Sequence, residues 1–344
     1  MGEYYDGTKL LSMLDCNGKK PEIYIACGNR SSGKTTYFNR LCINRFLKYK
    51  EKFCLLYRFG YELDSVEDKF FKDIRNLFFK NYQMQSVKRS HGMYRELFLN
   101  EQPCGYAVCL NYADQIKKQS HLFSDVGCIL FDEFQSETNK YCGEEVTKFV
   151  SVHMSIARGN GSAVRYVPVY MLSNAVTMLN PFYVAMDIST RLRSDTKFLK
   201  GDGFVLEQSY LESVSNEQKN SGFNRAFKRS DYISYASENV YLADNLVFIE
   251  KPEGSNYYLC TLKYKRKEYA VRKYPDLGIV YCDDRPDRTF PSKISLTTDD
   301  MDINYVALKE NSVTVSQFRY YFNHGCFRFK DLMCKEVILK MLSY

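Results

Sequence analysis

The first part of the chain alternates between short apolar runs and stretches with helical periodicity. Residues 22–26 predict a buried strand, a glycine-bounded loop follows, and residues 35–50 carry apolar side chains at helical spacing. The alternation continues to about residue 190, with strands predicted at 52–58, 126–131 and 166–172, a charged amphipathic stretch at 66–80 and a helix at 144–157. This pattern is typical of a doubly wound α/β fold with a mostly parallel sheet.

The pattern changes after about residue 200. Residues 207–239 are rich in Ser, Asn, Glu and Lys, and short β-type runs separated by turn residues follow them. These runs and the closing helix are predicted at 247–249, 257–263, 268–272, 279–282 and 334–342. We therefore expect an α/β domain at 1–205, a linker subdomain at 206–239 and a smaller α+β domain at 240–344.

Composition and charge narrow the class of protein without identifying it. The chain has 344 residues, of which 45% are hydrophobic and 26% charged, so it is not intrinsically disordered. Its net charge of +7 permits a polyanionic partner but does not require one. No signal peptide or membrane-spanning run is present, so we expect a soluble intracellular protein with no membrane partner. Twelve cysteines are scattered without a C-x-x-C pair, which indicates reduced thiols.

A phosphate-binding loop lies between the first predicted strand and its helix. Residues 28–35 read Gly-Asn-Arg-Ser-Ser-Gly-Lys-Thr and fit G-x-x-x-x-G-K-[ST] completely. The residues expected to bind the phosphates of ATP are Gly28, Asn29, Arg30, Ser31, Ser32, Gly33, Lys34, Thr35 and Thr36. Backbone N–H groups and the helix N-terminus attract the phosphates, the Lys34 ammonium reaches the β- and γ-phosphates, and the Thr35 hydroxyl ligates Mg²⁺.

Two carboxylates follow the predicted strand at 126–131. Asp132 is placed to hold the Mg²⁺ shell, and Glu133 to polarise a water for attack on the γ-phosphate. Small-molecule kinases usually lack such an activating carboxylate. GTPases need Asn-Lys-x-Asp, and the nearest sequence here, at 139–142, lacks the aspartate. ATP hydrolysis is therefore favoured over GTP hydrolysis or phosphoryl transfer to a metabolite.

Three further polar residues are candidates for the same site. Ser173 and Asn174 follow the next predicted strand, where they either sense the γ-phosphate or cap the following segment. Arg158 lies on a turn after a predicted helix, where it is either a solvated cation or an arginine finger that reaches a neighbouring subunit.

With these residues assembled, the chain resembles the DNA-packaging ATPases of small protein-primed phages of the phi29 type, which are encapsidation proteins related to large terminases. The resemblance extends beyond the generic ATPase motifs and covers both predicted domains. Its blocks are Ile-Asn-Arg-Phe-Leu-Lys-Tyr at 43–49, Phe-Asp-Glu-Phe at 131–134, Leu-Ser-Asn-Ala-Val at 172–176, Val-Phe-Ile-Glu-Lys at 247–251 and Leu-Thr-Thr-Asp-Asp at 296–300.

The resemblance implies a homo-oligomeric ring motor, pentameric at the portal of the viral prohead, that hydrolyses ATP with Mg²⁺ to drive double-stranded DNA into the capsid. It also implies a structural prohead RNA as a partner and the host cytoplasm as the location. The residues that match the family's hydrolysis and coupling positions are Lys34, Thr35, Asp132, Glu133, Ser173 and Asn174. Arg158 matches the family's trans-acting arginine, and Lys117 or Lys118 matches its trans-acting lysine. The family's basic patch after the second strand is reduced here to Arg58.

The resemblance also implies that the C-terminal domain is a degenerate RNase H-like domain that does not cut DNA. Aspartates cluster in two turns, at 283–287 and 299–302, and we interpret them as turn and capping residues. A basic run, with Lys263, Lys265, Arg266 and Lys267, is either a nucleic-acid contact or a solvated hairpin face. Two alternatives stay open: a terminase whose C-terminal domain is an active metal-dependent nuclease, and an ATP-gated nucleic-acid-binding module with little turnover.

Overall fold

A computed structural model describes residues 4–137, 140–158, 164–177, 180–189, 191–192, 196–212, 215–216, 220–226 and 247–342. The chain forms two compact units, each assembled from separate stretches of sequence. The first, which we call the P-loop unit, comprises Met1–Gln135, Thr147–Ala175 and Ser194–Val240. The second, which we call the C-terminal unit, comprises Ser136–Val146, Val176–Arg193 and Tyr241–Tyr344.

The P-loop unit is built on one large sheet. Its strands are β1 (Ile23–Gly28), β2 (Lys52–Tyr57), β3 (Met84–Arg89), β4 (Tyr94–Leu99), β5 (Gln102–Cys109), β6 (Val126–Phe131), β7 (Val169–Asn174), β8 (Phe198–Gly201) and β9 (Phe204–Ser209). They lie in the order β3-β4-β5-β2-β6-β7-β1-β9-β8. The six adjacent strands β5, β2, β6, β7, β1 and β9 are parallel. Antiparallel neighbours occur only towards the two edges of this described sheet. The predicted mostly parallel sheet is confirmed.

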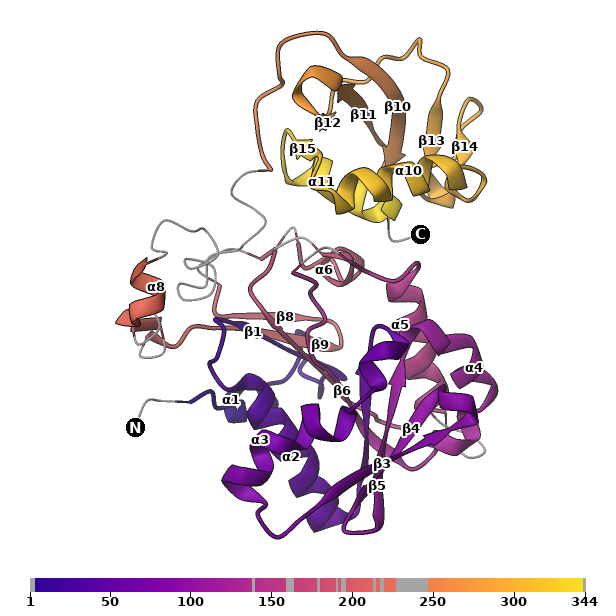
Figure 1. The fold of residues 1–344 in the computed structure, drawn as a ribbon. Coiled ribbons are helices and arrows are strands. Elements are labelled where there is room, and N and C mark those ends of the chain that lie inside the picture. The colour runs from indigo at the N-terminus through magenta and orange to yellow at the C-terminus, as the bar shows by residue number, and fades with distance from the viewer. Residues whose placement is uncertain are drawn as a thin grey trace. The chain divides into compact units, whose positions relative to one another are not determined.

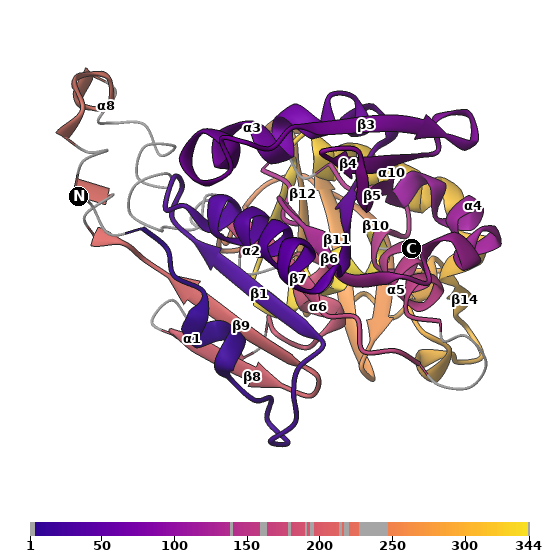
Figure 2. The ribbon, with the colours of Figure 1, turned by 90° about the horizontal axis from the view of Figure 1, so that it is seen from below.

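Helices cover both faces of this sheet. The helices of the unit are α1 (Thr8–Ser12), α2 (Lys34–Tyr49), α3 (Val66–Phe78), α4 (Ala113–Lys118), α5 (Glu145–Ile156) and α8 (Gly222–Ala226). Leu130 of β6 lies in a core cluster with residues of α2 and α3, which lie next to each other on that face (Figure 2). Its neighbour Phe131 stacks on Phe149 of α5 at 5.9 Å between ring centres. Because successive side chains of a strand point to opposite faces, α5 covers the other face.

Residues 84–109 form three strands that the hydrophobic pattern did not predict. The outermost, β3, presents mostly polar and partly exposed side chains, because it is an edge strand. At the other edge, β8 and β9 extend the sheet to Ser209, beyond the predicted end of the alternation near residue 190. The predicted boundary at 205/206 falls inside β9, and most of the predicted linker from residue 213 onwards lies outside the described residues.

The C-terminal unit is α+β, as predicted, with a sheet in the order β14-β13-β10-β11-β12-β15 (Figure 1). Its elements are α6 (Pro181–Ala185), β10 (Tyr257–Tyr264), β11 (Lys267–Tyr274), β12 (Ile279–Asp283), β13 (Lys293–Ser295), β14 (Val306–Ala307), α10 (Ser312–Asn323), β15 (Phe327–Phe329) and α11 (Leu332–Leu342). Strands β10, β11 and β12 form an antiparallel meander. Its core joins buried residues of the sheet, such as Val271, to Phe318 of α10 and Ile338 of α11.

Within the described ranges, no helix is both long enough and apolar enough to span a membrane. All twelve cysteines, each in the described part of the chain, are free thiols.

Candidate nucleotide-binding and hydrolysis site

The phosphate-binding loop begins where β1 approaches β9 most closely. A Cβ atom on Gly28 would lie 2.2 Å from the backbone oxygen of Ser209, so only glycine fits at the end of this strand. Asn29 is buried and its side chain pairs with the backbone of Leu211, through N–H donors at 3.2 and 3.3 Å. Gly33 has φ of 93°, a left-handed conformation that favours glycine, and it caps α2. Residues 28–33 therefore form the strand–loop–helix connection that the motif predicts.

Lys34 lies across this loop rather than in solvent. Its ammonium donates hydrogen bonds to the backbone oxygen of Asn29 at 2.9 Å and to the Ser32 hydroxyl at 3.0 Å. Burial lowers the pKa of Lys34, because desolvation penalises the charged form, while the nearby Asp132 carboxylate opposes the shift. The ammonium is thus held against the loop in a poorly solvated position, where a phosphate anion would be a strong partner.

Thr35 and Asp132 are joined directly. The Thr35 hydroxyl donates to the Asp132 carboxylate at 2.8 Å, although the two residues are 97 positions apart. Burial raises the pKa of Asp132, and its hydrogen bonds from Thr35 and from the Glu133 N–H oppose that rise. A hydroxyl and a carboxylate in contact are hard oxygen ligands of the kind that Mg²⁺ prefers, and a cation would compensate the partly desolvated carboxylate. These residues fit a magnesium site.

Glu133 is held in an unusual backbone conformation by its surroundings. Its φ is 53°, which is uncommon for a residue other than glycine, and its N–H donates to the Asp132 carboxylate at 2.8 Å. Arg58 is buried and donates to the backbone oxygen of Phe134 at 2.8 Å, and the Phe134 N–H donates to Leu172 of β7 at 3.1 Å. Arg58 therefore anchors the carboxylate-bearing loop to its neighbours.

One cavity of about 340 Å³ collects most of the predicted site residues. It is lined by Tyr4, Arg30, Ser31, Ser32, Gly33, Lys34, Thr35, Thr36, Asp132, Glu133, Ser173 and Asn174. Three of these segments meet here because β1, β6 and β7 are adjacent parallel strands whose carboxyl ends share one edge of the sheet, and Tyr4 comes from the segment before α1. The tyrosine was missed from the sequence, since nothing in the pattern around residue 4 indicates that it lies beside the loop.

Of the residues predicted for nucleotide binding and hydrolysis, five do not line this cavity: Gly28 and Asn29 of the loop, and Arg158, Lys117 and Lys118. Arg158 is exposed beyond the end of α5, and the glycine-containing turn predicted at 159–161 lies outside the described residues. Lys117 and Lys118 are exposed in the last turn of α4. Their predicted action on a neighbouring subunit stays a prediction.

The predicted basic run forms the hairpin between β10 and β11. Lys265 and Arg266 occupy its two-residue turn with φ of 49° and 61°. Lys263, Arg266 and Lys267 line an open cavity of about 630 Å³ together with Arg288 and several acidic residues. Lys263 also pairs with Asp302 at 2.8 Å, so the side chains of the run do not all share one environment.

Aspartates of the C-terminal unit pair with cationic side chains and accept hydrogen bonds from N–H groups. Asp283 is buried and pairs with Arg272 at 2.6 Å. Asp300 accepts the N–H groups of Lys265 and Arg266 at 3.0 and 2.8 Å, which stabilises the hairpin turn. Across the residues that the structure describes, no group of three or more His, Cys, Asp or Glu side chains is arranged to hold a metal ion.

The fold and this site together define a P-loop nucleotide-binding protein with a carboxylate pair beside the loop. The family follows from comparison with known proteins. Residues 3–343 match the Podovirus DNA encapsidation protein (Gp16) family, and because the match covers nearly the whole chain, the chain belongs to that family.

Individual relatives agree with this assignment. The chain is 24% identical over 318 residues to the DNA packaging protein of Bacillus phage phi29, with 91% of each chain covered. It is 25% identical over 325 residues to that of Bacillus phage B103, covering 92% of this chain and 94% of the relative. Its fold is similar to a chain of the bacteriophage Phi-29 viral genome packaging motor assembly, with a TM-score of 0.58, 22% identity and coverage of 99% and 100%. It is also similar to the Phi-28 gp11 DNA packaging motor, with a TM-score of 0.59, 16% identity and coverage of 100% and 99%.

Proposed function

We propose that this chain is an ATP hydrolase that drives double-stranded viral DNA into a preformed capsid. The observation that carries the proposal is the contact of Thr35 with Asp132 in the cavity that also holds Lys34 and Glu133. Family membership supports the packaging role, and the names of the phi29 and B103 relatives support it further.

The residues of the cavity have complementary roles in hydrolysis. Loop N–H groups and the Lys34 ammonium bind the phosphates of ATP. Thr35 and Asp132 would hold Mg²⁺, which would neutralise charge on the phosphates. Glu133 orients a water and accepts its proton as the oxygen attacks the γ-phosphorus. The bond from that phosphorus to the β–γ bridging oxygen breaks, and ADP leaves with the electron pair. Ser173 and Asn174, at the end of β7, respond to the loss of the γ-phosphate.

The active form in this proposal is a homo-oligomeric ring, pentameric at the portal of the prohead in the host cytoplasm. Arg158, with Lys117 or Lys118, completes the site of the neighbouring subunit. Their exposure and their positions outside the cavity of their own chain support action in trans. The similarity to a chain of a packaging motor assembly supports an oligomer.

The C-terminal unit contacts nucleic acid in this proposal, either the DNA or a structural prohead RNA, through Lys263, Lys265, Arg266 and Lys267. It does not cut DNA. The engagement of Asp283 by Arg272 and of Asp300 by backbone N–H groups supports the absence of nuclease activity, because such carboxylates are poorly placed to bind paired metals.

A Glu133→Gln variant tests the proposed chemistry. The amide cannot accept the proton, so we expect DNA-stimulated phosphate release to fall by about 100-fold or more, the usual contribution of a general base. ATP affinity should remain within a few-fold of the unmodified protein, because the phosphate contacts are intact. Phosphate release and binding of a fluorescent ATP analogue measure the two effects.

The matched control is Glu144→Gln, which changes an exposed carboxylate away from the cavity. Unaltered phosphate release by Glu133→Gln would contradict the assigned role. If the unmodified protein binds ATP but shows no multiple turnover with prohead and DNA present, the chain is an ATP-gated binding module instead.

A further inference from the structure

The segment that leaves the predicted sensor strand belongs to the C-terminal unit. Strand β7 ends at Ser173 and Asn174, and the second stretch of the C-terminal unit begins at Val176. A single residue, Ala175, therefore separates the two sensor residues from the other unit. Ala175 and Val176 are both 1% exposed, so this connection is packed on all sides. Close packing leaves little room for it to absorb a displacement of the strand end.

A buried lysine of the last helix holds this segment. Lys335 of α11 is only 3% exposed, and its ammonium donates to the Thr177 hydroxyl at 3.1 Å. The same nitrogen lies 5.8 Å from the ring centre of Phe248, which enters the unit from the linker side. Burying an ammonium group is unfavourable unless polar partners compensate it, and the Thr177 hydroxyl is one such partner of Lys335.

Two further contacts bind the same segment to α11. Val184 of α6 packs against Leu339, one helical turn beyond Lys335. After α6, Asp187 pairs with Lys265 at 3.4 Å, and Lys265 pairs with Glu336 of α11 at 3.0 Å. Asn180 caps α6 by accepting the Tyr183 N–H at 3.0 Å, which stabilises the start of this short helix.

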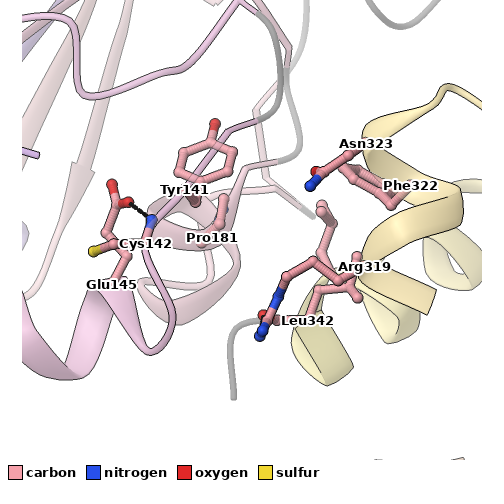
Figure 3. Close-up of a pocket in the computed structure, with 9 residues that line it drawn as sticks. Tyr141, Cys142, Glu145, Pro181, Arg319, Phe322, Asn323 and Leu342 are labelled. Atoms are coloured by element: carbon pink, nitrogen blue, oxygen red, sulfur yellow. Dashed lines mark hydrogen bonds between the residues drawn. The ribbon is translucent and has the colours of Figure 1, made fainter. Parts of the chain in front are cut away.

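The segment that follows the catalytic carboxylates also packs in the C-terminal unit. Residues 136–146 come directly after the β6 loop, and Tyr141 and Cys142 face a small apolar cavity beside Pro181 of α6 (Figure 3). The opposite wall of that cavity is formed by α10 and α11, through residues such as Phe322 and Leu339. The segments that follow β6 and β7 therefore both face α10 and α11 within the C-terminal unit.

We propose that Lys335 is a positioning residue for Ser173 and Asn174, acting through Thr177, and that this contact passes a change at the γ-phosphate into the C-terminal unit. The proposal rests on the proposed function, because it requires a nucleotide in the P-loop cavity. From Asn174 to Thr177 the chain spans at most about 10 Å, so a shift of the strand end reaches Thr177 within three residues. The ammonium–hydroxyl contact then delivers that shift to α11.

Amide hydrogen exchange on the full-length protein tests this, with Mg²⁺ and either ADP or a non-hydrolysable ATP analogue. In the unmodified protein we expect exchange in 176–189 and in α11 to differ between the two nucleotides by about fivefold or more, the lower end of usual coupling between sites. In Lys335→Met the P-loop should remain protected by nucleotide, while the difference in α11 disappears. Methionine matches the length of lysine and packs without a charge, so the unit should stay folded.

Two variants change the other partner of the contact. Thr177→Val removes the hydroxyl and should also abolish the difference in α11, whereas Thr177→Ser keeps the hydroxyl and should restore it. The control is Lys330→Met, which removes an exposed ion pair with Asp284 next to α11 and should respond like the unmodified protein.

The outcomes separate this inference from the proposed function. Protection of the P-loop without any nucleotide-dependent difference in α11, or a difference that persists in both Lys335→Met and Thr177→Val, overturns the positioning role and leaves the ATPase assignment standing. Absence of P-loop protection by either nucleotide contradicts the ATPase assignment, and the inference falls with it.

Discussion

At the scale of single residues, the buried charged groups of this protein differ in the partners that balance their charge. Lys34 and Asp132 are partly compensated by the loop and by Thr35, and burial lowers the pKa of Lys34 and raises the pKa of Asp132. The buried pair of Asp283 and Arg272, in contrast, is complete within the chain, since Arg272 also donates to the backbone oxygen of Arg285 at 2.7 Å. Lys34 and Asp132 are therefore available to a ligand, whereas the ion pair of Asp283 and Arg272 stabilises the fold.

The pair in the C-terminal unit makes a prediction about stability. Asp283→Ala leaves the Arg272 guanidinium buried without its counter-ion, which should cost about 3–5 kcal/mol of unfolding free energy. Urea unfolding measures the loss. Asp299→Ala, at an exposed aspartate of the neighbouring acidic cluster, should change it by less than about 0.5 kcal/mol.

A double variant and an activity assay complete that test. Arg272→Met with Asp283→Leu replaces the pair by apolar side chains and should recover most of the stability lost in Asp283→Ala. Plasmid nicking with Mn²⁺ that disappears in a folded Asp283 variant would instead assign this carboxylate to an active nuclease.

At the scale of elements, strand neighbours decide which residues the hydrolysis site can contain. The order β6-β7-β1-β9 brings the carboxylates, the sensor residues, the loop and Ser209 to one edge of the sheet. Gly28 is constrained by the packing of the sheet, because the backbone of β9 would collide with any Cβ atom there. The first glycine of the motif therefore has a packing role in this protein.

Substitution of that glycine tests the constraint. In Gly28→Ala the added methyl group must displace the Ser209 backbone, because a strand paired on both sides cannot move cheaply, and we expect a loss of about 1–3 kcal/mol. The unfolding temperature and the affinity for an ATP analogue should both decrease. Gly143→Ala is the matched control, since a Cβ atom at Gly143 meets nothing within 4 Å. Equal stability of the two variants would refute the close approach of β9.

At the scale of the whole molecule, a modest net charge of +7 is compatible with a motor that acts on DNA. In the proposed ring, several copies of each weak basic patch would surround one duplex, so a single chain need not be strongly cationic. Weak individual contacts also allow a motor to grip and release DNA.

Subunit mixing tests whether the site is completed in trans. Lys34→Ala and Arg158→Ala chains should each be inactive alone, and mixed rings should regain part of the ATPase activity at interfaces where both partners are intact. Phosphate release across mixing ratios measures the recovery. Mixing Lys34→Ala with Lys309→Ala, which changes an exposed lysine outside the proposed sites, shows the activity expected when the arginine is present on every subunit. No recovery at any ratio, with assembly shown to be normal, would contradict the trans role.

Sequence patterns predicted the features that depend on neighbours along the chain. The loop at 28–35 and the carboxylates at 132–133 could be read directly, because each is a short run of residues whose chemistry is local. Four of the six parallel strands, β1, β2, β6 and β7, were also predicted, since buried strands are short apolar runs. Strand β3 was not, because an edge strand carries polar residues on both faces and has no distinctive period.

Features that depend on residues far apart in the sequence could not be predicted without the folded structure. Arg58 read as the remnant of a basic patch, but 76 residues separate it from Phe134, whose backbone it holds. Lys335 read as part of a closing helix, and its contact with Thr177 spans 158 residues. Local chemistry and periodicity thus predicted a P-loop and the pair of carboxylates beside it. The division into two interleaved units, and the residues that contact the segments after β6 and β7, depended on the tertiary structure, because long-range packing leaves no regular spacing in the sequence.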